Sequence, residues 1–459
     1  MIEGLNDTEL ELSDLEPTKF VGFDTLESDA TVVMLLDRDG NKIDELKDDL
    51  GFVIFDTTPF FALGGGQESD NGCVVKKDNS KLPIVDLRKD IVDGIYIHEV
   101  NAENNVLNIG DKVHLLVNDT KREQASQNHS ALHITWSTLH TMLNEDLPEV
   151  GSKLNDEKYQ IQFEPDWRVT EQFVMDVVNK MNADVFTKDI KTKIYEISEQ
   201  EAKDKNYLLD FTKVDKGENV RMVEFPGVGL EPCSGTHITS TNEITKVYYL
   251  NYDRNKKRVS LDLTTNYAFA KNYFDEKIIA KVREIETLEG KIKNLKPDYI
   301  KTPNLADFEK EENWNYLSVQ KLNQVFNDVT KTLNTLAKEE QKRLAKEFEA
   351  FDFNEETISN NNKTVTLMSF NDERITDKIV VSSAMKMSRD YQTNLFAIYN
   401  EALKNLIIVS NDKALDLKSI ADNEDIYNKF DLKGGGSPKM LTLTLSDDNQ
   451  KEVINSLLN

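Results

Sequence analysis

The sequence predicts an α+β protein built from several domains. Its 459 residues are more than one hydrophobic core can organise. Short apolar runs separated by turn residues fill the N-terminal part, whereas helical periodicity with many Lys, Glu and Leu residues fills 267–350. Between these two parts, strand-like and helix-like segments are mixed. We therefore expect four parts, which are residues 1–117, 118–266, 267–350 and 351–459.

Residues 1–117 have the pattern of a small β-barrel or sandwich, and we expect a barrel. Apolar runs at 30–36, 51–55, 94–98 and 112–117 are separated by turn signals such as Asp39-Gly40. Short strands at regular spacing with Asp-Gly turns are typical of such folds. The first fifteen residues are acidic, and we expect them to be frayed.

Residues 118–266 predict a mixed domain that begins with a long helix. Leu132, Trp136, Leu139 and Leu143 recur at helical spacing, which favours a helix from Lys121 to about Leu143. The pattern further on predicts strands at 159–163, 247–250 and 258–263, with helices around 170–182 and 197–204.

Residues 267–350 predict a helical arm of two helices, interrupted at Pro297 and Pro303 because proline breaks a helix. A paired antiparallel arm would suit a homodimer. The polar run 354–362 has the composition of a linker. An α/β module is expected after it, with strands near 364–369, 395–399, 406–410 and 441–445 and helices at 376–391, 414–430 and 447–458.

The charge argues against broad, non-specific binding of nucleic acid. The chain has 82 acidic against 56 basic residues, a net charge of −26, and such binding needs a basic surface. A local patch can still hold RNA, and Lys257 and Arg258, in a run of three basic residues, are the candidates. The two cysteines form no disulfide framework, and the sequence has no long apolar run and no basic-then-apolar leader. We expect a cytoplasmic protein that does not enter membranes.

Two short segments together predict a metal site. His129 and His133 stand at i and i+4, so a helix places both rings on one face. Cys233 and His237 follow a loop rich in Pro and Gly. Alone, such a His pair often occurs by chance on the surface of a helix. A buried Cys commonly packs as a small hydrophobic residue. Together they form a set of ligands that suits Zn²⁺. Four protein ligands close a tetrahedron, which favours a structural or substrate-holding ion.

A glycine-rich run offers a second candidate site. Gly64, Gly65 and Gly66 allow close approach of the backbone to a ligand, and Gln67 directly after them has both donors and an acceptor. Thr58 has a hydroxyl that could recognise another hydroxyl. The alternative is a tight turn of the barrel whose neighbouring phenylalanines belong to the core.

A third glycine-rich run, 433–439, lacks the spacing of a phosphate-binding loop. A surface loop is its simpler interpretation. The sequence also has no Gly-x-Ser-x-Gly elbow, no dinucleotide fingerprint and no signature of ATP binding that would power a ligation.

The order of these motifs resembles the alanyl-tRNA editing family. The motifs are T-P-F-F-x-x-G-G-G-Q, H-x-x-x-H, C-x-G-T-H, a helical arm and K-G-G-G-x-P. From Thr18 to the C-terminus the chain is similar to long stand-alone editing proteins (AlaX type), which themselves look like the editing domain and C-terminal region of alanyl-tRNA synthetase. Three positions depart from the family pattern. Leu63 replaces a commonly acidic residue, Ser234 replaces a usual Gly, and 441–445 lacks the usual small residues.

The resemblance implies hydrolysis of tRNA(Ala) mischarged with serine, and also with glycine. It implies that His129, His133, Cys233 and His237 hold zinc. It also implies that Gly64, Gly65, Gly66 and Gln67 line the aminoacyl pocket with Thr58 close by, and that Gly434, Gly435 and Gly436 approach RNA. An aminoacyl ester is already activated, so a positioned water can suffice without a covalent nucleophile. The two alternatives are a non-catalytic tRNA-binding protein with a structural zinc and an editing enzyme for another misacylated tRNA.

Overall fold

The computed structural model forms two compact units. It describes residues 12, 15–47, 49–90, 94–103, 105–144, 147, 149–164, 167–205, 219–256, 258–360, 362–412, 414–421 and 424–458. Unit 1 comprises Met1–Glu284 and Thr302–Val325, and unit 2 comprises Ile285–Lys301 and Phe326–Asn459. Most of the acidic N-terminus lies outside the described residues. The predicted α+β class is confirmed, while the boundaries of the four predicted parts stay predictions.

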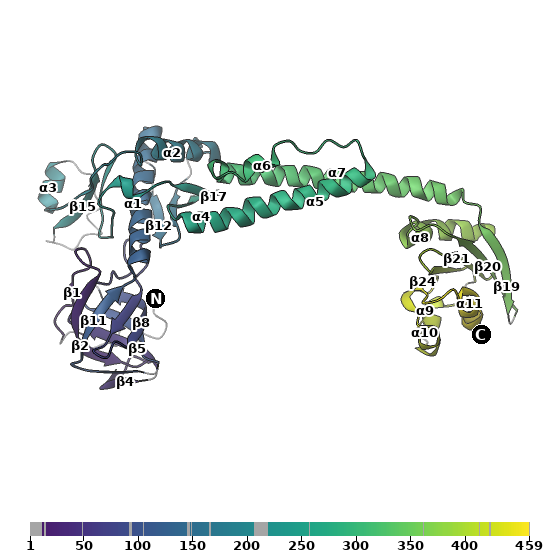
Figure 1. The fold of residues 1–459 in the computed structure, drawn as a ribbon, viewed down its shortest axis with the longest axis horizontal. Coiled ribbons are helices and arrows are strands. Elements are labelled where there is room, and N and C mark those ends of the chain that lie inside the picture. The colour runs from purple at the N-terminus through teal and green to yellow at the C-terminus, as the bar shows by residue number, and fades with distance from the viewer. Residues whose placement is uncertain are drawn as a thin grey trace. The chain divides into compact units, whose positions relative to one another are not determined.

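Unit 1 begins with a closed β-barrel. Strands run in the order β11-β7-β8-β9-β5-β2-β3, and the antiparallel pairing of β11 with β2 closes six of them into a barrel (Figure 1). Closure removes exposed strand edges, and alternate side chains such as Val53, Phe55 and Leu115 fill the interior. The predicted barrel is confirmed. Its strands are β2 (Glu27–Leu36), β3 (Lys42–Ile43), β5 (Leu50–Phe55), β7 (Gly72–Val75), β8 (Lys81–Lys89), β9 (Tyr96–Asn101) and β11 (Lys112–Val117).

Four short strands add two pairings outside that sheet. They are β1 (Lys19–Phe20) with β6 (Thr57–Thr58), and β4 (Glu45–Lys47) with β10 (Val106–Asn108). The chain segment after β6 carries the glycine-rich run, so the barrel supplies the base from which that run extends.

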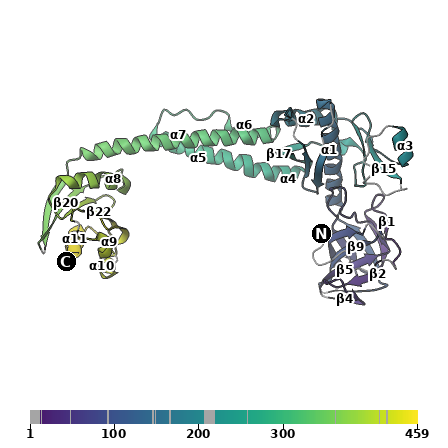
Figure 2. The same ribbon diagram turned by 180° about the vertical axis from the view of Figure 1, so that it is seen from behind.

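Helix α1 (Asp119–Leu143) leads from the barrel into the second part of unit 1 (Figures 1 and 2). The Asn118 side chain caps its first turn by accepting from the Lys121 amide, and Asn144 ends it in the left-handed conformation. The helix is buried on most sides, and Leu132, Trp136 and Leu139 belong to the core of this part. The predicted long helix is confirmed.

Two antiparallel sheets complete the mixed part of unit 1. One has the order β12-β13-β18-β17 and the other β14-β15-β16. Helix α2 (Glu171–Asp184) packs with α1 over the first sheet, and the short α3 (Glu199–Asp204) follows β14. The strands are β12 (Glu149–Leu154), β13 (Tyr159–Phe163), β14 (Lys193–Ile197), β15 (Val220–Phe225), β16 (Gly229–Pro232), β17 (Tyr248–Asn255) and β18 (Arg258–Thr264).

The first long helical stretch ends at Leu295, just before Pro297, and the predicted break extends past Pro303. Helix α4 (Tyr267–Phe274) continues through a π-helical segment, Asp275–Ile279, into α5 (Ala280–Leu295). The short α6 (Leu305–Phe308) precedes α7 (Tyr316–Glu349). Tyr316 packs in unit 1 against Tyr249, with ring centroids 5.3 Å apart. Among the described residues, no helix has the length and apolar character needed to cross a membrane.

Unit 2 contains a six-stranded sheet in the order β19-β20-β21-β22-β24-β23, in which only β20 and β21 are parallel. Helix α8 and the C-terminal helices pack on its faces through two apolar clusters. The strands are β19 (Asn354–Asn360), β20 (Lys363–Phe370), β21 (Leu395–Asn400), β22 (Asn405–Ser410), β23 (Lys433–Ser437) and β24 (Met440–Thr444). The helices are α8 (Asp377–Met387), α9 (Leu417–Ala421), α10 (Glu424–Phe430) and α11 (Gln450–Leu458).

Two expectations for unit 2 are wrong. The polar run predicted as a linker forms β19, which pairs with β20 along its whole length. The glycine-rich run predicted as a surface loop forms β23 and pairs with β24. Both are edge strands with mostly exposed side chains. Edge strands need little apolar alternation, so their sequences do not show the usual strand pattern.

Candidate metal centre

Four predicted ligands meet in unit 1. His129 and His133 lie one turn apart on α1, with ring centroids 5.0 Å apart and nearly parallel planes. Cys233 and His237 lie on the segment that follows β16. The Cys233 sulfur is 3.3 Å from Nε2 of His129 and 3.3 Å from Nε2 of His237. One ligand atom from each of the four residues lies within 4.8 Å of the others, so the set could hold a metal ion.

The three imidazole rings are oriented by partners outside the cluster. Nδ1 of His129 lies 2.8 Å from the Gln67 amide oxygen. Nδ1 of His133 contacts the Glu231 carboxylate, and Nδ1 of His237 lies 3.1 Å from the Ser130 hydroxyl. Such outer contacts are typical of metal-binding histidines, because they direct Nε2 at the ion.

One buried nitrogen of the cluster shows that these residues fit a metal ion. Nε2 of His133 is buried and, among the described residues, has no hydrogen-bond partner. A buried nitrogen costs free energy unless its lone pair binds an ion or accepts a hydrogen bond, or its N–H donates one. A metal ion bound by the other three ligands would satisfy it.

The electrostatics of the cluster favour a thiolate. Burial raises the pKa of Cys233, but the adjacent His129 and His133 outweigh it and hold that pKa well below its ordinary value. Burial lowers the pKa of His133. The charges of Glu231 and Cys233 raise it by more, so that the pKa lies well above its ordinary value. Burial lowers the pKa of His237 to about 3. The lowered pKa of Cys233 favours its thiolate, which is the form that binds a metal cation.

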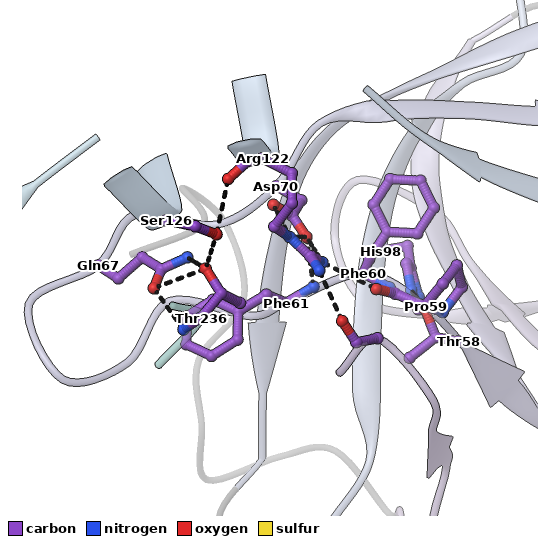
Figure 3. Close-up of polar contacts among 11 residues, drawn as sticks. Thr58, Pro59, Phe60, Phe61, Gln67, Asp70, His98, Arg122, Ser126 and Thr236 are labelled. Carbon is purple, nitrogen blue, oxygen red and sulfur yellow. Dashed lines mark hydrogen bonds and ion pairs between the residues drawn. The ribbon is translucent and has the colours of Figure 1, made fainter. Parts of the chain in front are cut away.

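Gln67 connects the glycine-rich loop to Thr236, which lies between Cys233 and His237 in the sequence (Figure 3). Its side chain is fully buried, its amide oxygen accepts from the Thr236 backbone at 3.0 Å, and its Nε2 donates to the Thr236 hydroxyl at 2.9 Å. Ser126 of α1 also donates to that hydroxyl, at 2.8 Å. Gln67 thus orients His129 and holds the segment between Cys233 and His237. Its predicted contact with a substrate stays a prediction.

The glycine-rich loop packs against β12 and extends to the exposed side of the cluster. Gly66 has φ +81°, and a β-carbon there would lie 2.7 Å from the Ser152 carbonyl oxygen. The carbonyl of Gly66 accepts from the Leu154 amide at 2.8 Å. Gly65 is exposed, and a β-carbon there would lie 3.8 Å from the hydroxyl oxygen of Ser234, which is also exposed. The loop and the Cys233 segment therefore lie side by side next to the partly exposed Cys233 and His237.

A buried ion pair anchors the far end of this loop. Nε of Arg122, on α1, donates to Asp70 at 2.9 and 3.0 Å. The same guanidinium donates to the carbonyls of Gly22 at 2.6 Å and Pro59 at 2.9 Å, and Asp70 accepts from the Phe61 amide (Figure 3). No local sequence pattern predicts this pair, because its members are 52 positions apart.

The structure does not bring Thr58 to the cluster. Thr58 is fully buried in the barrel, its hydroxyl lies 2.8 Å from Nε2 of His98, and it accepts from the Phe60 amide at 3.2 Å. Figure 3 shows Thr58 and His98 on the opposite side of the Arg122–Asp70 pair from Gln67. Its predicted contact with serine stays a prediction, and its observed partner is His98.

A cavity of about 360 Å³ lies beside the loop that follows the glycines. Carboxylates of Glu68, Asp86 and Asp156 line it with Lys121, and Leu63 is 56% exposed at its wall. None of the four cluster ligands lines this cavity. It is therefore distinct from the exposed side of the metal cluster.

The residues predicted to contact RNA lie elsewhere. Lys257 is outside the described residues, and Arg258 is exposed at the start of β18, where it donates to Gln162 at 3.3 Å. Gly434, Gly435 and Gly436 are exposed on β23. A β-carbon at Gly434 would lie 2.1 Å from the Thr442 carbonyl, so this strand needs glycine there. Contact of these residues with RNA stays a prediction.

Comparison with known proteins gives a similarity to one class of enzymes over part of the chain. A family model described as tRNA synthetases class II (A) matches residues 3–121. More particularly, the chain is similar to alanine–tRNA ligases. It is 31% identical to the one from Thermoanaerobacter sp. over 229 residues, which cover 50% of this chain and 25% of the relative. It is 25% identical to the one from Mycoplasmopsis agalactiae over 456 residues, which cover 98% of this chain and 49% of the relative.

The chain therefore resembles parts of alanine–tRNA ligases, as the motifs predicted. It spans from a quarter to about half the length of these curated relatives. A solved structure described as the DHH domain of a member of a family of ribosomal proteins has a TM-score of 0.20 and 13% identity, over 42% of this chain and 44% of that one.

Proposed function

We propose that this chain is a zinc-dependent hydrolase that deacylates tRNA(Ala) mischarged with serine or glycine. The observation that most supports this proposal is a cluster beside an exposed glycine-rich loop. The cluster consists of His129, His133, Cys233 and His237. The likeness to alanine–tRNA ligases supports tRNA(Ala) as the nucleic-acid part of the substrate.

Three imidazole nitrogens and one thiolate suit zinc better than magnesium or calcium, which prefer oxygen ligands. A bound zinc ion would act as a Lewis acid that holds or polarises an oxygen of the ester. The work of the chain is to keep the donors in place. Gln67, Glu231 and Ser130 fix the three rings, so the donor set is preorganised.

The exposed loop gives the ester a place to bind. Gly65 has no side chain to block the approach of a ribose or an amino acid, and the Ser234 hydroxyl lies next to it. Hydrogen-bond donors around an ester carbonyl can stabilise the charge that develops as water attacks. A site that binds a substrate hydroxyl can also reject the analogue that lacks it, which would favour serine over alanine.

Deacylation of three charged tRNAs tests the proposal. We expect the full chain to release serine and glycine from tRNA(Ala) much faster than alanine. Cys233→Ala should abolish both zinc binding and release, whereas the matched change Cys73→Ala should leave both intact, because Cys73 lies on barrel strand β7. Persistence of the serine ester at micromolar protein would contradict the proposal.

The closed set of four protein ligands favours one second candidate, a non-catalytic tRNA-binding protein with a structural zinc. Tight binding of tRNA(Ala) without serine release would select it. Exchanging the tRNA body in the same assay tests a third possibility, an editing enzyme for another misacylated tRNA. Faster serine release from a tRNA other than tRNA(Ala) would select that one.

A further inference from the structure

The turn that carries Cys233 is held by one arginine of β15. Nη1 of Arg221 donates to the carbonyl of Cys233 at 2.6 Å and to the carbonyl of Gly235 at 3.0 Å. The carbonyl of Arg221 accepts from the Cys233 amide at 3.0 Å. Because β16 ends at Pro232, Cys233 lies just beyond the regular pairing of the sheet. Arg221 therefore supplies the contacts that the strand ladder no longer provides.

The turn between Cys233 and His237 tolerates little movement. A β-carbon at Gly235 would lie 2.0 Å from Cε1 of His129, so the turn backbone is pressed against the ring of a ligand. The Gly235 amide also donates to the Cys233 sulfur at 3.3 Å. A shift of the turn would thus move the sulfur, its amide donor and the neighbouring imidazole together.

Arg221 is itself held by the barrel. Its guanidinium carbon lies 4.2 Å from the centre of the Phe23 ring, a distance at which a cation is attracted to the face of an aromatic ring. Phe23 lies between β1 and β2 and packs edge-on against Phe20, with centroids 5.0 Å apart. Arg122 binds the carbonyl of the neighbouring Gly22. Two arginines of the mixed part of unit 1 therefore hold one short barrel segment.

We propose that Arg221 is a positioning residue of the metal centre, which fixes the Cys233–Gly235 turn and couples it to the barrel through Phe23. The inference rests on the proposed metal centre. Only arginine has a planar group that can donate to two carbonyls and stack on a ring at once. Lysine would keep the charge but lose this geometry, so Arg221→Lys isolates the geometry of the contact.

Cobalt(II) binding to the full chain tests this inference, because the thiolate-to-cobalt and d–d absorption bands report ligand geometry directly. We expect Arg221→Lys to bind cobalt and zinc roughly 10-fold more weakly, the lower end of the range for outer-shell changes, with a changed cobalt spectrum. Phe23→Leu should change the spectrum in the same direction but less. In deacylation, kcat should fall while KM for tRNA stays unchanged.

Arg254→Lys is the matched control. Arg254 also donates to a backbone carbonyl, that of Val169 at 3.3 Å, but no cluster residue is among its hydrogen-bond partners. We expect this control to keep the cobalt spectrum and the metal affinity of the unaltered chain.

The outcomes separate this inference from the proposal it rests on. An unaltered chain that binds neither cobalt nor zinc would overturn the metal centre and this inference with it. A cobalt spectrum and affinity unchanged by Arg221→Lys would overturn the positioning role alone. Should Arg221→Lys fail to fold, Phe23→Leu decides, and an unchanged spectrum in that variant overturns the coupling.

Discussion

The amide oxygen of Gln67 lies 2.8 Å from Nδ1 of His129, although the two residues are 62 positions apart. That oxygen can only accept, so His129 carries its proton on Nδ1 and directs the lone pair of Nε2 at the cluster. The same oxygen accepts from the Thr236 amide, and the Gln67 Nε2 donates to the Thr236 hydroxyl. One buried side chain of the barrel loop therefore orders both segments that carry the ligands.

Replacing Gln67 with Met should weaken metal binding. Methionine has a similar length but leaves the His129 Nδ1–H and the Thr236 amide without an acceptor, which costs about 1–3 kcal/mol per buried group. We expect metal affinity to fall about 10- to 100-fold, as for other outer-shell changes. Competition with a chromophoric chelator measures it. Gln67→Glu keeps the acceptors and should bind more tightly than the Met variant, and equal affinity of the two would contradict the argument.

Gly235→Ala should destroy the metal centre. The new β-carbon would lie 2.0 Å from Cε1 and 2.4 Å from Nδ1 of His129, so the ring or the turn must move. Zinc content per chain after purification should drop well below one. Gly151→Ala is the control because a β-carbon there meets nothing within 4 Å. Full zinc content in both variants would show that the turn has more freedom than the structure allows.

Removal of the Arg122 guanidinium should strongly destabilise the chain. In Arg122→Met, the buried Asp70 carboxylate and the carbonyls of Gly22 and Pro59 lose their donors. Breaking a buried pair in this way typically costs about 3–5 kcal/mol. Urea unfolding should show this loss, whereas Lys180→Ala, which removes an exposed pair with Asp184, should cost less than about 1 kcal/mol. Similar costs for both changes would refute the anchoring role.

Thr58 should contribute mainly to the free energy of unfolding of the barrel. Thr58→Val removes the hydroxyl and leaves the Phe60 amide and Nε2 of His98 without this partner, at a cost of about 1–3 kcal/mol. Thr58→Ser keeps the hydroxyl and should restore much of this loss. Urea unfolding measures the cost, and the ratio of serine to alanine release tests selectivity. A Val variant of full stability with altered selectivity would favour the predicted contact with substrate instead.

Burial of His98 should make the barrel sensitive to acid. Burial lowers the pKa of His98 from 6.5 to about 3. Between these pH values His98 is protonated in the unfolded chain but neutral in the folded chain. The contribution of His98 to stability therefore falls as pH falls from 6.5 towards 3. The expected slope is about 1.4 kcal/mol per pH unit.

Unfolding of His98→Gln measured across this pH range gives the comparison. The variant should show a shallower pH dependence than the unaltered chain, because the other groups that titrate are common to both proteins. His114 on β11 should show the opposite sign, since a hydrogen bond to Asp29 raises its pKa. Parallel curves for the unaltered chain and His98→Gln would contradict the assignment.

The barrel, the long helix, the break at the prolines and the four clustered residues could all be predicted from the sequence. These features depend on local patterns, namely short apolar runs, 3.6-residue periodicity, proline chemistry and the spacing of His129 with His133 and of Cys233 with His237. The orientation of those four side chains could not be predicted, because it depends on contacts between segments that are far apart in the chain. Gln67 meets Thr236 across 169 positions, and Arg122 meets Asp70 across 52.

The surroundings of several side chains also follow only from the fold. Thr58 ends the short strand β6 ahead of the glycine-rich run, yet its hydroxyl pairs with His98 on β9 inside the barrel. The runs 354–360 and 433–437 have the composition of loops, yet each becomes an edge strand because a neighbouring strand offers its free hydrogen-bonding groups. Thr58 and His98 are 40 positions apart and leave no local pattern in the sequence, so only the folded chain reveals their contact.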